Sequence, residues 1–435
     1  SNNTACIFEV EYGKPFYLTA RVLSTTRNYF VDSNGVNPQI QIFTEDATYD
    51  HQKFDNVPNG YDRLYISAFS ASVKPSCQIG EYTAVASKNE LYDVSGFDAV
   101  PTYYGTYLSQ KITAINNAML TSNDAFIFVT DIHIGANSMA SMPLMREILR
   151  HTSINKVFMG GDIPTAYGTE SSMIAQANKF RKEYNDNILP YGHYYSARGN
   201  HDLTIRTSAD DTSGVTYPWK AAYDYLHRKQ EEYTDILDSR GYYFIDNSSE
   251  KIRYVVLNTC EITNTSVSFG ITPYIRYEQL KWLGDVALNV PTDDWHVFVI
   301  GHVPMASDMS GYSEWVQKAE VLLSAYQEKA VSDSITVNDY AGESHTFTID
   351  FSNYKGVLIG YICGHNHLDE DSDEDGVLSI STTSDAMFNT DGYGRSFGTT
   401  SESAFDVVCI DKANQSLSLI RVGAGNNRSF IYPPA

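Results

Sequence analysis

The sequence predicts an α/β fold, a four-layer α-β-β-α sandwich, preceded by a small all-β domain with a β-sandwich-like layout. Over about the last three hundred residues, short runs rich in Val, Ile and Phe alternate with segments of helical periodicity. Over about the first hundred residues, short β-type segments alternate with turn-rich stretches and show no helical period. Because 435 residues exceed the usual size of one hydrophobic core, we expect two domains, at 1–100 and 101–435.

The N-terminal domain is expected to consist of short strands separated by turns rich in Gly, Pro and Asn. This layout resembles the β-sandwich accessory modules of tailed-phage structural proteins and of bacterial surface proteins. The resemblance implies a carbohydrate-binding, assembly or spacer role, and we favour assembly or spacing over a sugar site. The predicted strands are Cys6–Val10, Phe16–Val22, Gln39–Phe43, Arg63–Phe69 and Tyr82–Ala86.

The α/β domain follows a connector at Ser95–Thr106. Ile112, Ile115 and Met119 recur at helical spacing, so we expect them to face the core. The predicted helices are Tyr107–Leu120, Pro143–His151, Ser172–Asp186, Trp219–Tyr233, Tyr277–Leu288 and Ser313–Lys329. The predicted buried strands are Phe126–Thr130, Val157–Gly161, Val297–Gly301 and Val357–Gly364.

Each of these four strands ends in Gly or a turn and is followed by a polar side chain that can bind a metal or transfer a proton. Functional groups of α/β sheets lie in the loops beyond the carboxyl ends of the strands, and Gly lets the backbone turn sharply there. Five short blocks of sequence contain these side chains: Asp131-Ile-His133, Gly161-Asp162, Gly199-Asn200-His201-Asp202, Gly301-His302 and Gly364-His365-Asn366-His367. Five of the eleven histidines fall in these blocks, which argues that they are not ordinary core or surface histidines.

In this order the blocks read DxH, GD, GNHD, GH and GHxH, a pattern that resembles the calcineurin-like metallophosphoesterase superfamily over about residues 120–425. The resemblance implies a dinuclear metal centre. One metal would be held by Asp131, His133 and His367, the other by Asn200, His302 and His365, and Asp162 would bridge the two.

The chemistry of the donors agrees with this assignment. Imidazole, carboxylate and amide groups suit two divalent ions such as Mn, Fe, Zn or Ni, and no thiolate is offered. Two such ions can acidify a bridging water, so that hydroxide attacks phosphorus. The resemblance implies that His201 stabilises the transition state or protonates the leaving group, with Asp202 orienting its imidazole.

Other positions bear on the subfamily and on substrate binding. Purple acid phosphatases resemble this chain but carry a Tyr ligand where it has Thr165, so we do not expect a tyrosinate–iron centre. Arg198 precedes Gly199, as a phosphate-contacting Arg does in serine/threonine protein phosphatases. Arg198 and Asn366 are therefore candidate substrate-binding residues, although a salt-bridging or solvent-facing Arg198 is the favoured alternative.

The composition restricts the partners. With 31 basic and 53 acidic residues the net charge is −22, which disfavours non-specific binding of nucleic acid. No apolar run is long enough to span a membrane. The 32 tyrosines and the modest Lys content favour an extracellular, cell-surface or virion-associated protein.

Two further features are ambiguous. Asp371–Gly376 matches the opening of a calcium loop, but Thr382 stands where the loop needs Glu, so we predict an acidic hairpin turn instead. The Gly-rich segments Gly392–Gly398 and Gly423–Arg428 could line a substrate mouth or be ordinary surface loops.

Together these observations predict a metal-dependent hydrolase of phosphoric esters, with monoesters and diesters both open. If the N-terminal domain belongs to a phage tail or a cell surface, a phosphate-containing surface polymer is a candidate substrate. One alternative is a nuclease or nucleotidase, although the acidic balance counts against long nucleic acids. Another is a phage-tail or surface structural protein with a vestigial phosphoesterase domain, against which the intact set of candidate ligands argues.

Overall fold

The computed structural model divides into two compact units, Ser1–Ala86 and Ser87–Ala435, and each is described by itself. The structure describes the strands of the first unit and, in the second, residues 100–134, 139–165, 170–202, 204–205, 215–216, 241–261, 273–388 and 391–433. The predicted boundary at residue 100 stays a prediction, because residues 87–99 lie outside the described ones. The predicted strand Tyr82–Ala86 and helix Trp219–Tyr233 lie outside them too.

The described part of the first unit is a seven-stranded sheet whose pairings are antiparallel. Two strands, at Phe16–Val22 and Arg63–Phe69, have the predicted bounds. The β-sandwich layout and the role of this unit stay predictions. The strands are β1 (Asn3–Glu9), β2 (Phe16–Val22), β3 (Asn28–Val31), β4 (Ile40–Gln41), β5 (Ala47–Phe54), β6 (Arg63–Phe69) and β7 (Ser76–Ile79).

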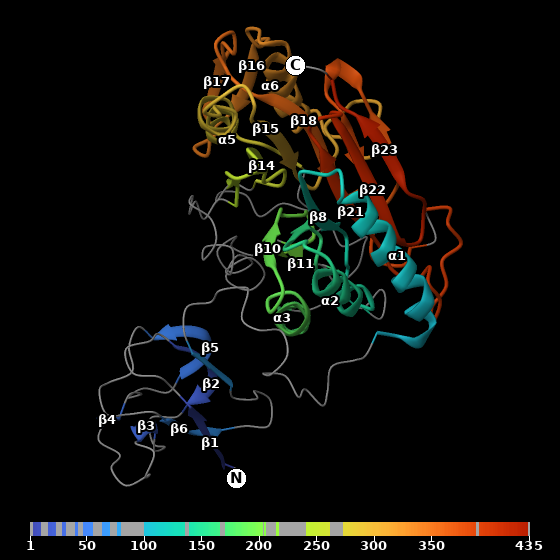
Figure 1. Cartoon of the computed structure of the whole chain (residues 1–435). Helices are drawn as coiled ribbons and strands as arrows, with labels where there is room; N and C mark the ends of the chain where they lie inside the picture. The colour runs from blue at the N-terminus through green and yellow to red at the C-terminus, as the bar shows by residue number, and fades with distance from the viewer. Residues whose placement is uncertain are drawn as a thin grey trace. The chain divides into compact units, whose positions relative to one another are not determined.

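The second unit contains two six-stranded sheets (Figure 1). Sheet I has the order β10-β9-β8-β21-β22-β23, and its first three strands are parallel. Sheet II has the order β13-β14-β15-β18-β20-β19, with β14, β15, β18 and β20 parallel. Sheet I comprises β8 (Asp124–Val129), β9 (Lys156–Met159), β10 (His193–Ser196), β21 (Ala404–Asp411), β22 (Ser416–Gly423) and β23 (Arg428–Ile431). Sheet II comprises β13 (Tyr243–Asn247), β14 (Ile252–Val256), β15 (His296–Ile300), β18 (Val357–Cys363), β19 (Glu370–Ser372) and β20 (Ser379–Ser381).

The two sheets share one hydrophobic core. Phe126 of β8 is fully buried, and its ring packs against Phe158 of β9, Tyr254 of β14 and Phe298 of β15, with centroids 5.0, 5.5 and 5.6 Å away. Strands covered on both faces need continuous apolar runs, which is why β14, β15 and β18 are buried along their whole length. Truncating Phe126 to Ala would cost about 3–5 kcal/mol and loosen the contact between the sheets.

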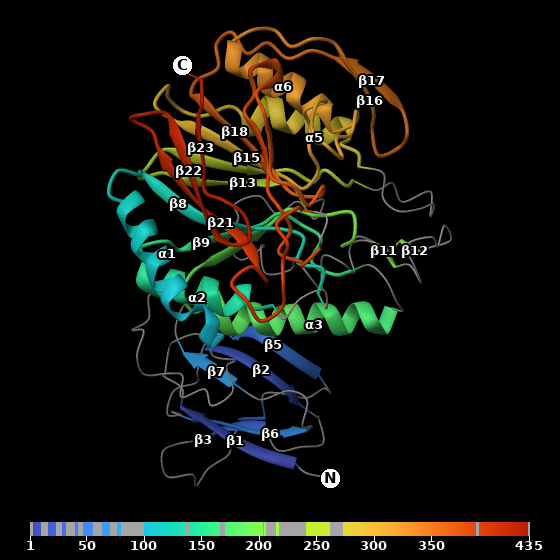
Figure 2. The ribbon, with the colours of Figure 1, turned by 90° about the vertical axis from the view of Figure 1, so that its right-hand side faces the viewer.

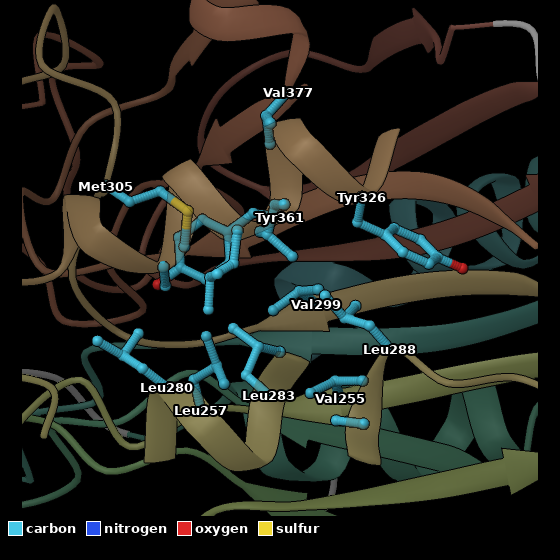
Figure 3. Close-up of a cluster of buried hydrophobic side chains, with 14 of the residues drawn as sticks. Val255, Leu257, Leu280, Leu283, Leu288, Val299, Met305, Tyr326, Tyr361 and Val377 are labelled. Atoms are coloured by element: carbon cyan, nitrogen blue, oxygen red, sulfur yellow. The ribbon is translucent and has the colours of Figure 1, made fainter. Parts of the chain in front are cut away.

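Helices cover the outer faces of the sheets (Figure 2). On sheet I, α1 (Gly105–Ala118) contacts β22, and α2 (Ser141–His151) contacts α3 (Glu170–Asn187). On sheet II, α5 (Tyr277–Trp282) and α6 (Gln317–Glu328) bury a second core. In that core, Leu280 and Leu283 lie below Val299 in the view of Figure 3, and Tyr361 and Met305 lie above the two leucines. The predicted mixed α/β architecture is thus confirmed.

The helix bounds differ from the predicted ones by a few residues, for local reasons. α6 ends at Glu328 because Lys329 adopts a left-handed conformation, with φ 55° and ψ 44°. The segment predicted as one helix, Tyr277–Leu288, is α5 followed by a π-helical turn at Leu283–Ala287. Among the described residues, no helix combines the length and the apolarity that a membrane span needs.

Two further pairs of short strands are antiparallel. β11 (Thr204–Ile205) pairs with β12 (Val215–Thr216), and β16 (Ile335–Asn338) with β17 (Ser344–Phe347). The acidic segment Asp371–Gly376 begins with the last two residues of β19 and continues into the turn that leads to β20, with which β19 pairs antiparallel. The predicted acidic hairpin turn is therefore confirmed.

Candidate metal centre

The predicted site residues lie in loops at the carboxyl ends of the central strands. On sheet I, Asp131 follows β8, Asp162 follows β9, and Asn200 follows β10. On sheet II, His302 follows β15 and His365 follows β18. Because the parallel strands of a sheet end at the same edge, residues separated by more than two hundred positions can meet in one cluster.

The first group of candidate ligands contains Asp131, His133 and His367, whose ligand atoms lie within 4.8 Å of one another. The Oδ1 atom of Asp131 is 3.3 Å from Nε2 of His367 and 3.8 Å from Nε2 of His133. The two Nε2 atoms are 3.3 Å apart. This is the set predicted to hold one metal.

The second group contains Asp162, His302 and His365. Nε2 of His302 is 3.3 Å from Oδ2 of Asp162, 3.3 Å from Nδ1 of His365 and 3.1 Å from Oδ1 of Asn200. Oδ2 of Asp162 is also 3.8 Å from Nε2 of His133, which belongs to the first group. Asp162 therefore lies between the two groups, as a bridging carboxylate must.

The donor set fits divalent cations. Among the described residues, the buried Oδ1 of Asp131 accepts no hydrogen bond, although a carboxylate oxygen out of contact with water needs a partner. Nδ1 of His302 lies 2.7 Å from the carbonyl oxygen of Gly160, so Nδ1 donates to that carbonyl and Nε2 is the ring atom that faces Asp162. Imidazole nitrogens held this way by a carbonyl are the usual form of histidine ligands.

The backbone at these positions is strained. Asp131, His133, Asp162, His365 and His367 have φ values of 52°, 41°, 53°, 74° and 59°, in the left-handed region that non-Gly residues rarely adopt. Such conformations cost about 1–3 kcal/mol each and persist only where the surroundings enforce them. Backbone hydrogen bonds between the loops provide this support: Asp131 N–H donates to Gly161 O and His133 N–H to Asp162 O.

Two glycines let the loops approach this closely. A Cβ atom at Gly364 would lie 2.2 Å from Oδ2 of Asp131. A Cβ atom at Gly199 would lie 2.1 Å from Oδ1 of Asp162. Neither glycine has a left-handed φ, so the requirement is for space beside a carboxylate and not for an unusual backbone conformation.

The carboxylates and histidines of the cluster shift one another's pKa values. Burial favours the neutral acid at Asp162, but His302 and His201 outweigh it and hold the pKa well below its usual range. Burial favours the neutral imidazole at His302, but Asp162 and Asp131 outweigh it and raise the pKa to about 9. The cluster thus attracts positive charge, and a divalent cation can displace the histidine protons.

His201 lies beside the cluster. Its backbone N–H donates to Oδ1 of Asp162 over 2.7 Å, and its Nε2 is 3.9 Å from Oδ2 of the same residue. Its Nδ1 lies 3.0 Å from the carbonyl oxygen of Thr165, which fixes the orientation of the ring. His201 also belongs to a third group, with His133 and Asp162, whose atoms lie within 4.8 Å of one another.

The position of Asp202 differs from the prediction that it orients the imidazole of His201. Its carboxylate oxygens accept hydrogen bonds from the backbone N–H groups of Ile163 and Gly199, each over 2.8 Å. The Thr165 carbonyl occupies the expected place at His201 Nδ1. Burial and the nearby Asp162 raise the pKa of Asp202 to about 7. Asp202 therefore joins the two loops that present Asp162 and His201.

The two candidate substrate-binding residues are both engaged within the protein. Arg198 is only 2% exposed and its guanidinium lies against Gly241, so the solvent-facing alternative is wrong. The Asn366 amide donates to Ser310 O and to Glu370 Oε2, and its oxygen accepts from Ser381 Oγ and from the Leu368 N–H. Because these contacts use every donor and acceptor of the amide, Asn366 shapes the loop between His365 and His367 instead of facing a substrate.

A segment after β20, residues 382–388, contributes to the site and was not predicted. The Asp385 and Ala386 N–H groups donate to the carbonyls of Thr130 and Asp131, both over 2.9 Å. The Phe388 ring stacks on His367, with centroids 4.9 Å apart and planes 8° apart. The signal that could have found this segment is its place at the carboxyl end of a fourth parallel strand of sheet II.

Buried arginines hold this segment. Arg395, in the Gly392–Gly398 stretch, is 4% exposed and donates to the carbonyls of Ser384, Asp385 and Ala386. Arg395 is therefore part of the internal support of the site, and it is not a surface residue. In the second Gly-rich stretch, Gly425 lies against Arg421 and Asp369.

A cavity of about 450 Å³ lies at the opposite edge of the sheets, where β8, β9 and β10 begin. Its polar lining includes Asp124 and Lys156, whose side chains are paired over 2.9 Å. It is separated from the candidate ligands by the length of the strands, so it takes no part in their chemistry.

The fold and the cluster define a candidate metal-dependent phosphoesterase. A model of the family described as calcineurin-like phosphoesterase matches residues 125–369, more than half of the chain. The chain belongs to this family and is a hydrolase acting on phosphoesters. The predicted family resemblance is confirmed.

Comparison with known proteins gives three further similarities. The mouse (Mus musculus) acid sphingomyelinase-like phosphodiesterase 3b is 27% identical over 186 residues, 42% of this chain and 35% of the relative. The match thus spans about a third of that relative's length. A dimetal phosphatase from Danio rerio has a TM-score of 0.49 and 13% identity, covering 72% of this chain and 100% of that one. A phosphopantetheinyl hydrolase from Mycobacterium tuberculosis has a TM-score of 0.29 and 12% identity, covering 61% and 91%.

Proposed function

We propose that the protein hydrolyses phosphodiesters with two divalent cations. The observation that carries this proposal is the pair of adjoining ligand groups that meet at Asp162. One ion would be held by Asp131, His133 and His367, the other by Asn200, His302 and His365, and Asp162 would contact both. The donors suit Mn, Fe, Zn or Ni and contain no thiolate.

When bound, such ions acidify water and neutralise the charge that develops on the phosphoryl oxygens. The residues of this chain supply the electrostatic environment and hold the donors in place. The carboxylates of Asp131 and Asp162 are buried, so the site has a low dielectric and its charges act strongly on a phosphate group. The loops are tied to one another by backbone hydrogen bonds, which keeps the donors in place before substrate arrives.

We propose that His201 donates a proton to the leaving alcohol. Its Nδ1 is held at the Thr165 carbonyl, so Nε2 is the atom that a substrate oxygen would meet. The His201 side chain is 23% exposed, whereas that of Asp162 is 2% exposed, so His201 lies on the side open to solvent. A proton donor placed beside the phosphate is expected to contribute about 10²–10⁴ to the rate.

The diester preference is supported by the mouse relative, which is named a phosphodiesterase. We keep the proposal that a phosphate-containing surface polymer is the substrate and that the protein acts outside the cell, at a cell surface or on a virion. The nuclease or nucleotidase alternative is disfavoured for long nucleic acids by the net charge of −22.

The test compares turnover of bis-p-nitrophenyl phosphate and p-nitrophenyl phosphate by Mn-loaded protein, chelated protein and two variants. We expect a diester preference that is lost on chelation and in Asp162→Asn, because Asn cannot supply the bridging charge. His201→Ala should lower kcat by about 10²-fold or more and leave the metal content unchanged. His151→Ala is the matched control, because this histidine is 56% exposed on α2 and should leave turnover unchanged.

A monoester preference would contradict the diester proposal and direct the search to nucleotides and small phosphates. Turnover of single-stranded DNA, but not of a teichoic-acid-type polymer, would favour the nuclease alternative. Bound metal without turnover of any ester would support the structural-protein alternative.

A further inference from the structure

The candidate metal centre is open to solvent on one side. The side chains of Asp131, Asp162, His133 and His302 are at most 5% exposed. Those of His201 and His367 are 23% and 22% exposed. A ligand that reaches the buried donors therefore passes over His201 and His367.

Phe388 lies on this open side. Its ring is half-buried and stacks on His367, with centroids 4.9 Å apart and planes 8° apart. The same ring meets the edge of His133, with centroids 5.3 Å apart and planes 70° apart. His133 in turn lies edge-on to His201, with centroids 4.9 Å apart. The aromatic ring thus borders the half of the site that contains the first group of candidate ligands.

The position of Phe388 is fixed by the same segment that supports Asp131. The Phe388 N–H donates to Ala386 O over 2.9 Å, and the Ala386 N–H donates to Asp131 O over 2.9 Å. Arg395 donates to the Ala386 carbonyl as well. Because the ring is held in place before a ligand binds, contact with it costs little ordering entropy.

We propose that Phe388 is a specificity-determining residue whose ring forms an apolar wall for the organic group attached to phosphorus. This inference rests on the proposed function. The charged phosphoryl oxygens belong with the cations and His201, so the organic group is left to face the apolar ring. The site should therefore favour ligands with a planar apolar substituent over those with a methyl group.

The test measures binding instead of turnover, so that it can fail independently of the proposed function. Phenylphosphonate and methylphosphonate, which cannot be hydrolysed as esters, are titrated calorimetrically into Mn-loaded protein. We expect the wild-type protein to bind phenylphosphonate about three- to tenfold more tightly, the usual size of an aromatic contact. Phe388→Ala should lose this difference by weakening only the phenyl compound, and Phe388→Leu should retain part of it.

Phe397→Ala is the matched control, because this phenylalanine lies nine positions away and is 61% exposed. It should bind both phosphonates as the wild-type protein does. The metal content of Phe388→Ala, measured by mass spectrometry, shows whether the ring contacts the ligand or only positions the candidate metal ligands. If Phe388→Ala loses metal and weakens both phosphonates equally, the ring only positions His133 and His367, and the proposal is overturned.

The proposal is also overturned if the wild-type protein does not distinguish the two phosphonates, or if Phe388→Ala distinguishes them as well as the wild type does. Turnover of the nitrophenyl esters is measured in parallel. Turnover without a phenyl preference would support the proposed function and overturn the role proposed for Phe388. A phenyl preference without turnover would support the role of Phe388 and contradict the proposed function.

Discussion

Gly364→Ala should inactivate the centre although Gly364 is not a candidate ligand. A Cβ atom at this position would lie 2.2 Å from Oδ2 of Asp131 and 2.2 Å from Oγ1 of Thr130. Ordinary contacts of a carbon atom are about 3.5 Å or longer, so either the carboxylate or the chain around residue 364 must move by about 1 Å. Gly364 does not have a left-handed φ, so the substitution adds little backbone strain of its own.

The displaced carboxylate is closely held. Oδ2 of Asp131 accepts a hydrogen bond from Thr130 Oγ1 over 2.6 Å and one from the His365 N–H over 3.0 Å. Metal sites tolerate distance errors of only about 0.2 Å. A misplacement of about 1 Å at an active site costs about 10²-fold in rate. We therefore expect kcat/KM to fall about 100-fold and the affinity for Mn²⁺ to fall with it.

The assay combines calorimetric Mn²⁺ titration, turnover of bis-p-nitrophenyl phosphate and thermal unfolding. Gly105→Ala is the control, because a Cβ atom there meets nothing within 4 Å at the start of α1. The control should bind metal and turn over normally. If Gly364→Ala binds two Mn²⁺ ions with wild-type affinity and keeps its activity, the close approach of Gly364 to Asp131 does not matter and the reasoning is refuted.

Two further predictions concern stability. Glu320 on α6 is fully buried. Burial, with Asp375 and Glu374 nearby, raises its pKa to about 8. A raised pKa makes the free energy of unfolding fall as pH rises from about 4.5 to about 8, so Glu320→Gln should remove most of that fall, a few kcal/mol in order of magnitude. Urea titrations at acidic and alkaline pH test this, and parallel pH profiles for the two proteins would contradict it. Chelation should lower the melting temperature because Asp131 and Asp162 lose their cations, and Mn²⁺ at about 100 times its Kd should restore about 2.7 kcal/mol. A melting temperature that does not change when Mn²⁺ is added would argue against a metal centre.

The strands and candidate ligands could be predicted because the signal for each is local. The run that forms β8 and the turn that presents Asp131 are adjacent in sequence, and the same is true of β15 and His302. Parallel pairing then dictates that such turns meet at one edge. Knowing the pairing was not needed to identify the residues, only to know that they converge.

The partners of individual side chains could not be predicted, because they depend on how loops pack across the two sheets. Asp202 accepts hydrogen bonds from Ile163 and Gly199, whereas an imidazole contact was expected. Phe388 belongs to no motif. Its ring contacts His133, which lies more than two hundred residues earlier in the chain. Sequence periodicity contains no information on such contacts.

The support of the site extends beyond the part of the chain that the family model matches, which ends at residue 369. Arg421 of β22 is fully buried and donates to the carboxylates of Asp369 and Asp406. Asp369 accepts a hydrogen bond from the Thr383 N–H, and Thr383 Oγ1 donates to the carbonyl of His367. A buried charge network therefore runs from the C-terminal strands to a candidate ligand.

This network explains how strained ligand positions are maintained. His367 has a left-handed φ of 59°, and the hydrogen bond from Thr383 holds its carbonyl in that conformation. β21, which carries Asp406, pairs with β8, whose carboxyl end presents Asp131. Removing one charge of a buried pair leaves the other uncompensated, at a cost of about 3–5 kcal/mol. The C-terminal strands thus act on the centre through His367 and Asp131, without contributing a candidate ligand from their described residues.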